Sequence, residues 1–345
     1  MTASRRALSL VTGAVLLVAA LSAPDRAAAT TAAIRCSEVD LPVLALGLLP
    51  QSVHGQLCLP ADHAPGTVQL LVHGGTYSSR YWDLPYEPDR YSYQRDMAAH
   101  GFATFAMDCL GSGGSSMPPS VLLSGAVQAQ VIHQVVGQLR TGRVDGLRFD
   151  RVVLSGHSTG SGFAVLEAST YHDVEGVVLT GMTHRLHWPV HISVFVDHVR
   201  PVQFDPVLST RGGDPGYVTT TPGSRGVFHQ PGDVDPGVVA ADEATKDRLP
   251  LTVLSDTVPL AFETNLSRQI DVPVLIADGQ DDPLFCYAVC ASADELRSEE
   301  APYFGPAAEL SVFLLPDTGH AIALSRNAPT YRDAVRDWMT AHIAG

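Results

Sequence analysis

Apolar runs of strand length alternate with helix-length segments along most of the chain. Several runs, such as residues 272–277 and 312–315, are continuously apolar, which is typical of strands buried on both faces of a parallel sheet. The predicted strands are residues 54–60, 67–73, 102–107, 151–156, 175–181, 272–278 and 309–315. The predicted helices are residues 120–140, 160–171, 287–299 and 327–343. This alternation predicts an α/β fold with a mostly parallel twisted sheet and helices on both faces.

One region, residues 183–270, interrupts the alternation. It lies between two predicted strands and is far longer than an ordinary connection. Residues 200–237 are rich in Pro, Gly, Asp and Thr, whereas residues 238–249 and 251–268 are predicted to be helical. Because long structured insertions often form lids, we expect this region to be a cap over a site, with a second, unrelated subdomain as the alternative. The core then consists of residues 30–182 and 271–345.

The N-terminus has the features of an export signal. Arg5 and Arg6 precede an apolar run from residue 7 to residue 23, and three alanines at 27–29 offer a cleavage site. The run is slightly short for a transmembrane helix, and no stop-transfer charges follow it. We therefore expect residues 1–29 to be a signal peptide, used by the general or the twin-arginine export route. The mature protein is then secreted without stable membrane insertion, and a retained membrane anchor is the alternative.

Composition narrows the class of protein. Hydrophobic residues make up 45% and charged residues 17% of the 345 residues, which is typical of a globular protein rather than a disordered one. The formal net charge of −14 argues against a nucleic-acid backbone or an anionic membrane surface as the main partner. This charge does not favour any particular small molecule as the substrate, and the sequence gives no oligomeric state.

If the protein is exported, its cysteines are expected to form disulfides, because disulfides persist outside the cytoplasm. There are five, so at least one is free or pairs between chains. The expected pairs are Cys36–Cys58 and Cys286–Cys290, with Cys109 buried and free, although spacing alone does not fix the connectivity. No Cys or His pair has a second pair at ligand spacing, so neither a metal nor another cofactor is expected.

Residues 156–160 read GHSTG and join the strand predicted at 151–156 to the helix predicted at 160–171. In a Gly-x-Ser-x-Gly turn the glycines let a tight strand-to-helix connection hold the serine above the sheet. With 30 glycines in the chain a chance match is not negligible. The strand before and the helix after are, however, the context that the motif requires. The sequence therefore predicts Ser158 as a nucleophile.

A serine hydroxyl is a weak nucleophile unless a base that is oriented by a carboxylate activates it. His320 follows the strand predicted at 309–315 and precedes the last helix, and it is the predicted base. The acid is expected in the loop after the strand predicted at 272–278, where the sequence reads GQDD. Asp278, Asp281 and Asp282 are all candidates, with Asp278 at the end of the strand, where it would cap the turn. Asp282 is preferred on the spacing of this turn, with Asp281 as the alternative.

An acyl-transfer site also needs two backbone N–H groups that bind the oxyanion. Thr159, which follows the nucleophile, is one predicted donor. Gly75, in the HGGT sequence after the strand predicted at 67–73, is the other, with Thr76 as the alternative. Candidate substrate contacts come from the neighbouring aromatic residues and from the residue before the nucleophile, with ordinary packing as the alternative reading: Tyr77, Tyr81, Trp82 and His157.

Taken together, these motifs resemble those of the α/β-hydrolase superfamily, and more closely its exported bacterial members with a cap. The resemblance covers about residues 40–345 and rests on the segments 73–75, 108–115, 156–160, 279–282 and 319–320. The order Ser158, Asp282, His320 is that of the family. The resemblance implies a serine hydrolase that cleaves a carboxylic ester of a small-to-medium apolar substrate through an acyl-enzyme. Serine at this position argues against the dehalogenase and epoxide hydrolase members, which use an aspartate.

Other functions use the same triad. Lactonases, amidases, peptidases and acyl-transferring or acyl-eliminating enzymes of secondary metabolism therefore remain alternatives. A protein of this fold that only binds a ligand typically lacks a triad member, and the sequence supplies all three, so catalysis is expected.

Overall fold

The structure is a computed structural model that describes residues 33–343 except residue 288. The signal peptide predicted at residues 1–29 lies outside the described residues. The described residues all belong to one compact unit. None of the helices among them has the length and apolar character that a membrane crossing requires.

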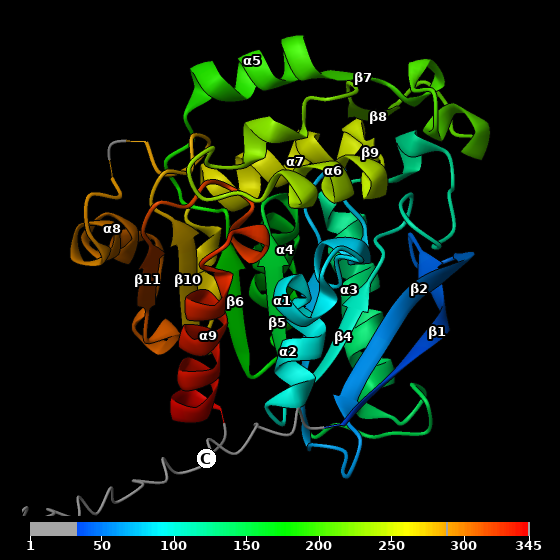
Figure 1. The fold of residues 1–345 in the computed structure, drawn as a ribbon. Coiled ribbons are helices and arrows are strands. Elements are labelled where there is room, and N and C mark those ends of the chain that lie inside the picture. Colours follow the sequence, from blue (N-terminus) through cyan, green and yellow to red (C-terminus); the bar gives the residue numbers. More distant parts are fainter. Residues whose placement is uncertain (1–32, 288, 344–345) are drawn as a thin grey trace, which may run out of the picture. The chain divides into compact units, whose positions relative to one another are not determined.

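A sheet of eight strands forms the centre of the described chain (Figure 1). Neighbours β1–β2 and β2–β4 are antiparallel, and all other neighbours are parallel. The strands, in the order of the sheet, are β1 (Ile34–Ala45), β2 (Leu49–Pro60), β4 (Ala103–Met107), β3 (Thr67–Val72), β5 (Arg151–His157), β6 (Gly176–Thr180), β10 (Val274–Gly279) and β11 (Ser311–Leu315). The inner parallel strands are buried along nearly their whole length, which explains their continuous apolar sequence. The predicted α/β fold class is confirmed.

Helices cover both faces of this sheet (Figure 1). α2 (Tyr93–Ala99) and α9 (Ala328–His342) lie on one face, and α3 (Gly125–Arg140) and α4 (Thr159–Tyr171) lie on the other. Two short helices complete the core, α1 (Pro88–Tyr91) before α2 and α8 (Ala293–Glu300) beside β11. α8 begins where the Ser292 hydroxyl accepts a hydrogen bond from the Glu295 N–H. The helix predicted at 287–299 therefore begins too early, because a turn precedes this cap.

β1 is a strand that the sequence analysis did not predict. It pairs antiparallel with β2 at the edge of the sheet. In its second half the buried Leu41, Val43 and Ala45 alternate with the exposed Pro42 and Leu44. This burial has the period of a half-buried strand, but the exposed positions are not polar, so the sequence alone does not show the alternation. Pro42 obscures it, although a proline is tolerated at an edge where its missing N–H breaks no ladder.

Residues 183–270 form small elements over the carboxyl ends of the parallel strands (Figure 1). They are α5 (Trp188–His198), β7 (Val199–Pro201), β8 (Tyr217–Thr220), α6 (Pro236–Thr245), β9 (Leu249–Pro250) and α7 (Leu254–Thr257). The three strands make an antiparallel sheet in the order β7-β8-β9. The helix predicted at 251–268 is broken into short turns, because Pro259 interrupts it. The boundaries drawn for a separate cap remain a prediction.

The cysteine pairing is as expected. Cys36 and Cys58 face each other across β1 and β2 and form one disulfide. Cys286 and Cys290 form the second, in the turn that precedes α8. Cys109 is buried and free. The first bridge joins the edge strand to the sheet, and the second closes the loop that follows Asp282.

Candidate active site

Ser158 lies between the end of β5 and the start of α4. Its backbone angles are φ 53° and ψ −119°, a strained conformation for a residue with a side chain. The turn requires glycine on both sides. A Cβ on Gly156 would lie 2.4 Å from the Gly160 carbonyl oxygen, and one on Gly160 would lie 2.5 Å from the His73 carbonyl oxygen. The GHSTG sequence thus forms the sharp strand-to-helix turn that presents a serine at the carboxyl edge of a sheet.

His320 lies in the loop after β11, and its ring is almost completely buried. The imidazole Nδ1 is 2.7 Å from the Asp282 Oδ2 atom. The other carboxylate oxygen of Asp282 accepts a hydrogen bond of 2.8 Å from the Leu284 N–H. A carboxylate can only accept here, so Nδ1 carries the proton and Nε2 keeps its lone pair. His320 is therefore oriented as a base whose free nitrogen is Nε2.

The two alternative acids occupy different surroundings. The Asp281 carboxylate is exposed and accepts a hydrogen bond of 3.0 Å from the Gln230 side-chain amide. Asp278 is fully buried at the end of β10, where burial and then the charge of Asp282 raise its pKa. Of the aspartates in this loop, the structure brings Asp282 to His320.

Gly75 and Thr159, whose N–H groups are expected to bind an oxyanion, lie close together. A Cβ on Gly75 would be 3.1 Å from the Thr159 hydroxyl oxygen. Among the described residues, neither the Gly75 N–H nor the Thr159 N–H donates a hydrogen bond. Both residues line one cavity together with Ser158 and His320. No hydrogen bond joins Ser158 to His320 in the described chain, and such contacts are often long before substrate binds.

The loop that carries Gly75 is anchored by His73. Its Nε2 accepts a hydrogen bond from the Cys109 N–H at 3.1 Å, and its Nδ1 lies 2.8 Å from the Gly74 carbonyl oxygen. Burial lowers the pKa of His73, which favours the neutral ring that this pattern needs. Asp108 in the next loop accepts hydrogen bonds from the Ser79 and Gly114 N–H groups. The HGG loop (residues 73–75) and the DCLGSGGS loop (residues 108–115) are thus hydrogen-bonded to each other beside the site.

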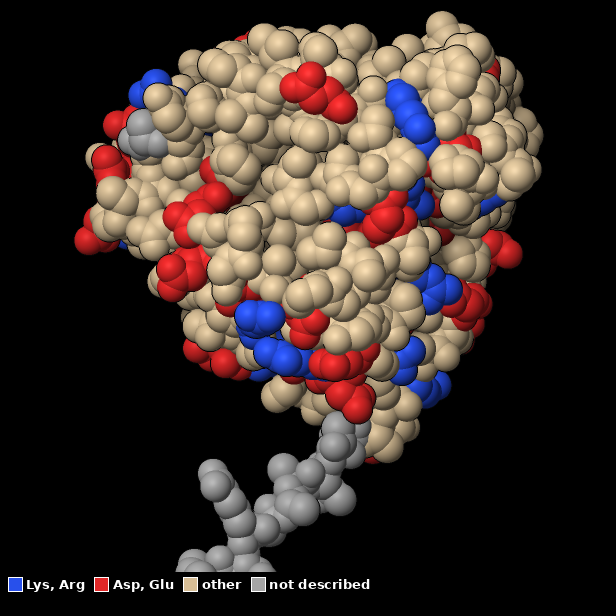
Figure 2. All heavy atoms as spheres, turned by 45° about the horizontal axis from the view of Figure 1, so that its top comes forward, with Lys and Arg blue, Asp and Glu red and all other residues tan. Residues whose placement is uncertain are grey.

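The cavity beside Ser158 has a volume of about 630 Å³, which suits a small or medium ligand. Glu263 is the only Asp, Glu, Lys or Arg among its described lining residues. The rest of the wall is mainly apolar and comes largely from α5, α7 and the loops around them, for example Leu186, Val194, Phe195, Leu254, Val258 and Phe262. Most of the upper surface in Figure 2 carries few charged groups, and several charged groups cluster in the lower part of the view.

The candidate substrate contacts are placed differently from one another. Tyr77 lines the cavity. Tyr81 and Trp82 are buried and pack edge-to-face, with ring centroids 4.8 Å apart. His157 is fully buried and stacks on Tyr81 at 4.3 Å, beside His320 at 4.8 Å. Burial, and then the charge of His320, lower the pKa of His157. This burial favours packing over substrate contact for Tyr81, Trp82 and His157.

One group of described residues has the composition of a metal site. His133, Glu167 and Asp173 each offer a ligand atom, and these atoms lie within 4.8 Å of one another. They belong to α3, α4 and the loop after α4, and none of them lines the cavity beside Ser158. The imidazole Nδ1 of His133 lies 2.6 Å from an Asp173 oxygen, so this pair is already bonded internally.

Glu167 of this group should weaken the fold at alkaline pH. Burial and the neighbouring Asp173 raise its pKa to about 10, from a usual value of 4.5. Between these values the folded chain keeps a proton that the unfolded chain releases, so the free energy of unfolding falls as pH rises. Glu167→Gln, which mimics the protonated acid, should raise that free energy by about 2–4 kcal/mol at pH 8 and by little near pH 5.

Urea unfolding of both proteins at the two pH values measures this effect. Glu295→Gln, at an exposed position on α8, is the matched control and should show no such pH-dependent gain. An equal gain from Glu167→Gln at pH 5 and pH 8 would contradict the assignment.

Comparison with known proteins gives a family match. A model described as "Alpha/beta hydrolase family" matches residues 69–334. These residues include the GHSTG turn, Asp282 and His320. No curated protein sequence matches the chain.

Solved structures share the fold at low sequence identity. An esterase from Thermogutta terrifontis is 17% identical, with a TM-score of 0.61 over 88% of this chain and 98% of that one. Carboxylesterase CesB from Bacillus subtilis is 16% identical, with a TM-score of 0.60 over 89% of this chain and 93% of that one. An enol-lactonase from Burkholderia xenovorans LB400 is 17% identical, with a TM-score of 0.58 over 87% of this chain and all of that one.

Proposed function

The chain belongs to the α/β hydrolase family, and from this premise we propose that it is a serine hydrolase that cleaves carboxylic esters through an acyl-enzyme. The proposal rests above all on one observation. A strained serine and a histidine that is hydrogen-bonded to a buried aspartate open onto the same apolar cavity. The similarity to esterases and to an enol-lactonase is in keeping with it.

In the proposed reaction Ser158 attacks the ester carbonyl and His320 Nε2 takes its proton. Asp282 holds the Nδ1–H tautomer and stabilises the imidazolium that forms. The free N–H groups of Gly75 and Thr159 bind the oxyanion, and His320 then protonates the leaving alcohol. In the second half of the cycle His320 activates water, which releases the acid and frees Ser158.

The apolar wall of the cavity defines the substrate class that we propose. An acyl or alcohol group of medium length would replace water along the side chains of α5 and α7, and each buried methylene would contribute about 0.8 kcal/mol. Residues 183–270 supply much of this wall, so we propose that they act as the cap that selects the substrate. A charged substrate would find only Glu263 to pair with among the described lining residues.

A panel of aryl esters of increasing acyl length tests this function. The wild-type protein should hydrolyse them above the buffer rate, with kcat/KM rising from acetate to a medium-length chain and falling once the chain exceeds the cavity. Incorporation of heavy oxygen from labelled water into the released acid distinguishes hydrolysis from acyl transfer or elimination. Rates equal to those of buffer for every ester would rule the proposal out.

We further propose that the protein is exported. The two disulfides among the described residues fit an oxidising compartment. The N-terminal sequence with its paired arginines, apolar run and alanine-rich end supplies the signal. Mass spectrometry of protein recovered from the culture medium should show a chain that begins near residue 30. An intact N-terminus on protein that stays in the cell would contradict export.

A further inference from the structure

Three charged or titratable residues within the 183–270 segment, outside the proposed triad, are buried together: Arg225, His229 and Asp242. Arg225 is 0% exposed and Asp242 is 1% exposed. The Arg225 Nε–H donates to Asp242 Oδ1 at 2.9 Å, and His229 Nε2 lies 2.9 Å from Asp242 Oδ2. Removing such charges from water costs free energy that their attraction does not reliably return. A role in placing other groups would explain why the chain keeps them.

Arg225 contacts the loop that carries the oxyanion-hole candidate. Its Nη1–H donates to the Thr76 hydroxyl at 2.8 Å, and its guanidinium lies over the Tyr77 ring at 3.9 Å. The Thr76 hydroxyl in turn donates to the Gly75 carbonyl at 2.6 Å. Thr76 has φ 62°, a left-handed conformation that a β-branched residue rarely adopts without support. The guanidinium of Arg225 provides such support from the side-chain end of Thr76.

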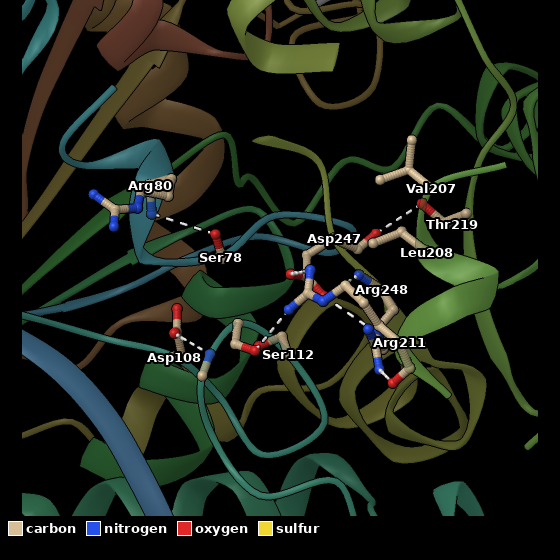
Figure 3. A network of polar contacts seen from close by, with 12 residues as sticks. Ser78, Arg80, Asp108, Ser112, Val207, Leu208, Arg211, Thr219, Asp247 and Arg248 are labelled. Carbon is tan, nitrogen blue, oxygen red and sulfur yellow. Dashed lines mark hydrogen bonds and ion pairs between the residues drawn. The ribbon is translucent and has the colours of Figure 1, made fainter. Parts of the chain in front are cut away.

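A second contact holds the backbone of Thr76. The Asp247 N–H donates to the Thr76 carbonyl at 2.9 Å. Asp247 is itself fixed by its neighbours around β8 and β9 (Figure 3). Arg211 contacts its carboxylate at 3.0 Å, and the Thr219 hydroxyl donates to its carbonyl at 2.7 Å. Residues of the 183–270 segment therefore hydrogen-bond to both the hydroxyl and the carbonyl of Thr76.

The turn that carries Arg225 also reaches the histidine loop. The Phe228 carbonyl accepts a hydrogen bond of 2.9 Å from the Ala321 N–H, and its ring lies 5.8 Å from that of His320. A Cβ on Gly319 would lie 2.7 Å from the Gln230 nitrogen, so the two loops are in close contact. One short segment, residues 225–230, thus touches both halves of the proposed catalytic machinery.

We propose that Arg225 is a positioning residue, which acts through the Thr76 hydroxyl to hold the Gly75–Thr76 backbone in the geometry that binds the oxyanion. Asp242 and His229 fix Arg225, and the 225–230 segment sets this loop relative to His320. The 183–270 segment is then needed for the chemical step itself and not only for admitting the substrate. This inference rests on the proposed ester hydrolysis and extends it.

Thr76→Val tests the proposal, because it keeps the branched shape and removes only the hydroxyl that Arg225 and Gly75 share. Turnover of the best aryl ester should fall by about 10- to 100-fold in kcat, with KM nearly unchanged, since a slightly misplaced oxyanion donor acts only in the transition state. Thr76→Ser, which restores the hydroxyl, should recover most of the loss. Arg225→Met should show the same fall in kcat if that variant folds. If it does not fold, the results for Thr76→Val and Thr76→Ser decide the test.

Arg185→Met is the matched control, since this exposed arginine of the same segment pairs with Glu299 at the surface. It should leave kcat unchanged. Wild-type kcat in Thr76→Val, or a loss confined to KM, would overturn the positioning role. Absence of ester hydrolysis by the wild-type protein would instead refute the proposed function, so the two failures are distinguishable.

Discussion

Replacing Ser158 with alanine is expected to lower the turnover of an aryl ester by about 10⁶-fold. The change removes the nucleophile and leaves the rest of the site intact. The remaining activity is then the slow attack of water on the ester, assisted by the other groups of the site. Alanine can occupy the strained turn as serine does, because the backbone angles are set by the close packing of Gly156 and Gly160. The urea midpoint should therefore stay near that of the wild type while the measured kcat collapses.

Ser298→Ala provides the matched control for this loss. Ser298 lies on α8 and is exposed, so the same deletion there should leave kcat unchanged. Residual turnover in Ser158→Ala within tenfold of the wild type would mean that another group performs the attack.

Asp282→Asn is expected to lower kcat by about 10⁴-fold. An asparagine amide presents an N–H toward His320 Nδ1, which favours the tautomer whose Nε2 carries a proton and cannot accept one from Ser158. The side chain keeps its size, and its oxygen can still accept from the Leu284 N–H. Steady-state kinetics on the best ester of the panel measures the loss.

Asp281→Asn separates the two candidate acids. The Asp281 carboxylate faces Gln230 at the surface, so its replacement should change kcat by less than about threefold, within the range of surface substitutions. A larger loss from Asp281→Asn than from Asp282→Asn would mean that Asp281, and not Asp282, is the acid.

Much of the core followed from local sequence. The inner strands are buried on both faces, so they appear as mainly apolar runs, which are typical of a parallel sheet. β1 was missed because it lies at the edge, where one face is wet and Pro42 interrupts the pattern. The helix predicted at 251–268 failed for a different reason, since Pro259 disturbs its regular hydrogen bonding and the segment divides into short turns.

The candidate site was predictable where its residues belong to short motifs with fixed backbone geometry. The GHSTG turn and the HGG loop are such motifs, because a Cβ on Gly156 or Gly160 would clash with backbone and one on Gly74 or Gly75 would make tight contacts of 3.1 Å. Asp281 and Asp282 are adjacent, and their sequence does not show which side chain the turn directs inward. The structure separates them through the hydrogen bonds of the turn, which point Asp282 to His320.

The Arg225 group could not be found from sequence alone. Its partner Thr76 is 149 residues away in the chain, Asp242 is 17 residues away, and no motif or periodicity connects them to Arg225. From the sequence, an arginine in a Pro- and Gly-rich segment is expected to lie at the surface. Only the three-dimensional packing shows that Arg225 is buried. Long-range polar contacts of this kind depend on how the 183–270 segment folds back over the sheet.

Treatment with a fluorophosphonate, followed by peptide mapping by mass spectrometry, tests whether Ser158 is a nucleophile activated by His320 and Asp282. We expect a single adduct, located on Ser158, that forms rapidly in the wild type, far more slowly in Asp282→Asn and not at all in Ser158→Ala. An adduct on another residue, or a wild-type protein that stays unlabelled, would contradict this role of Ser158.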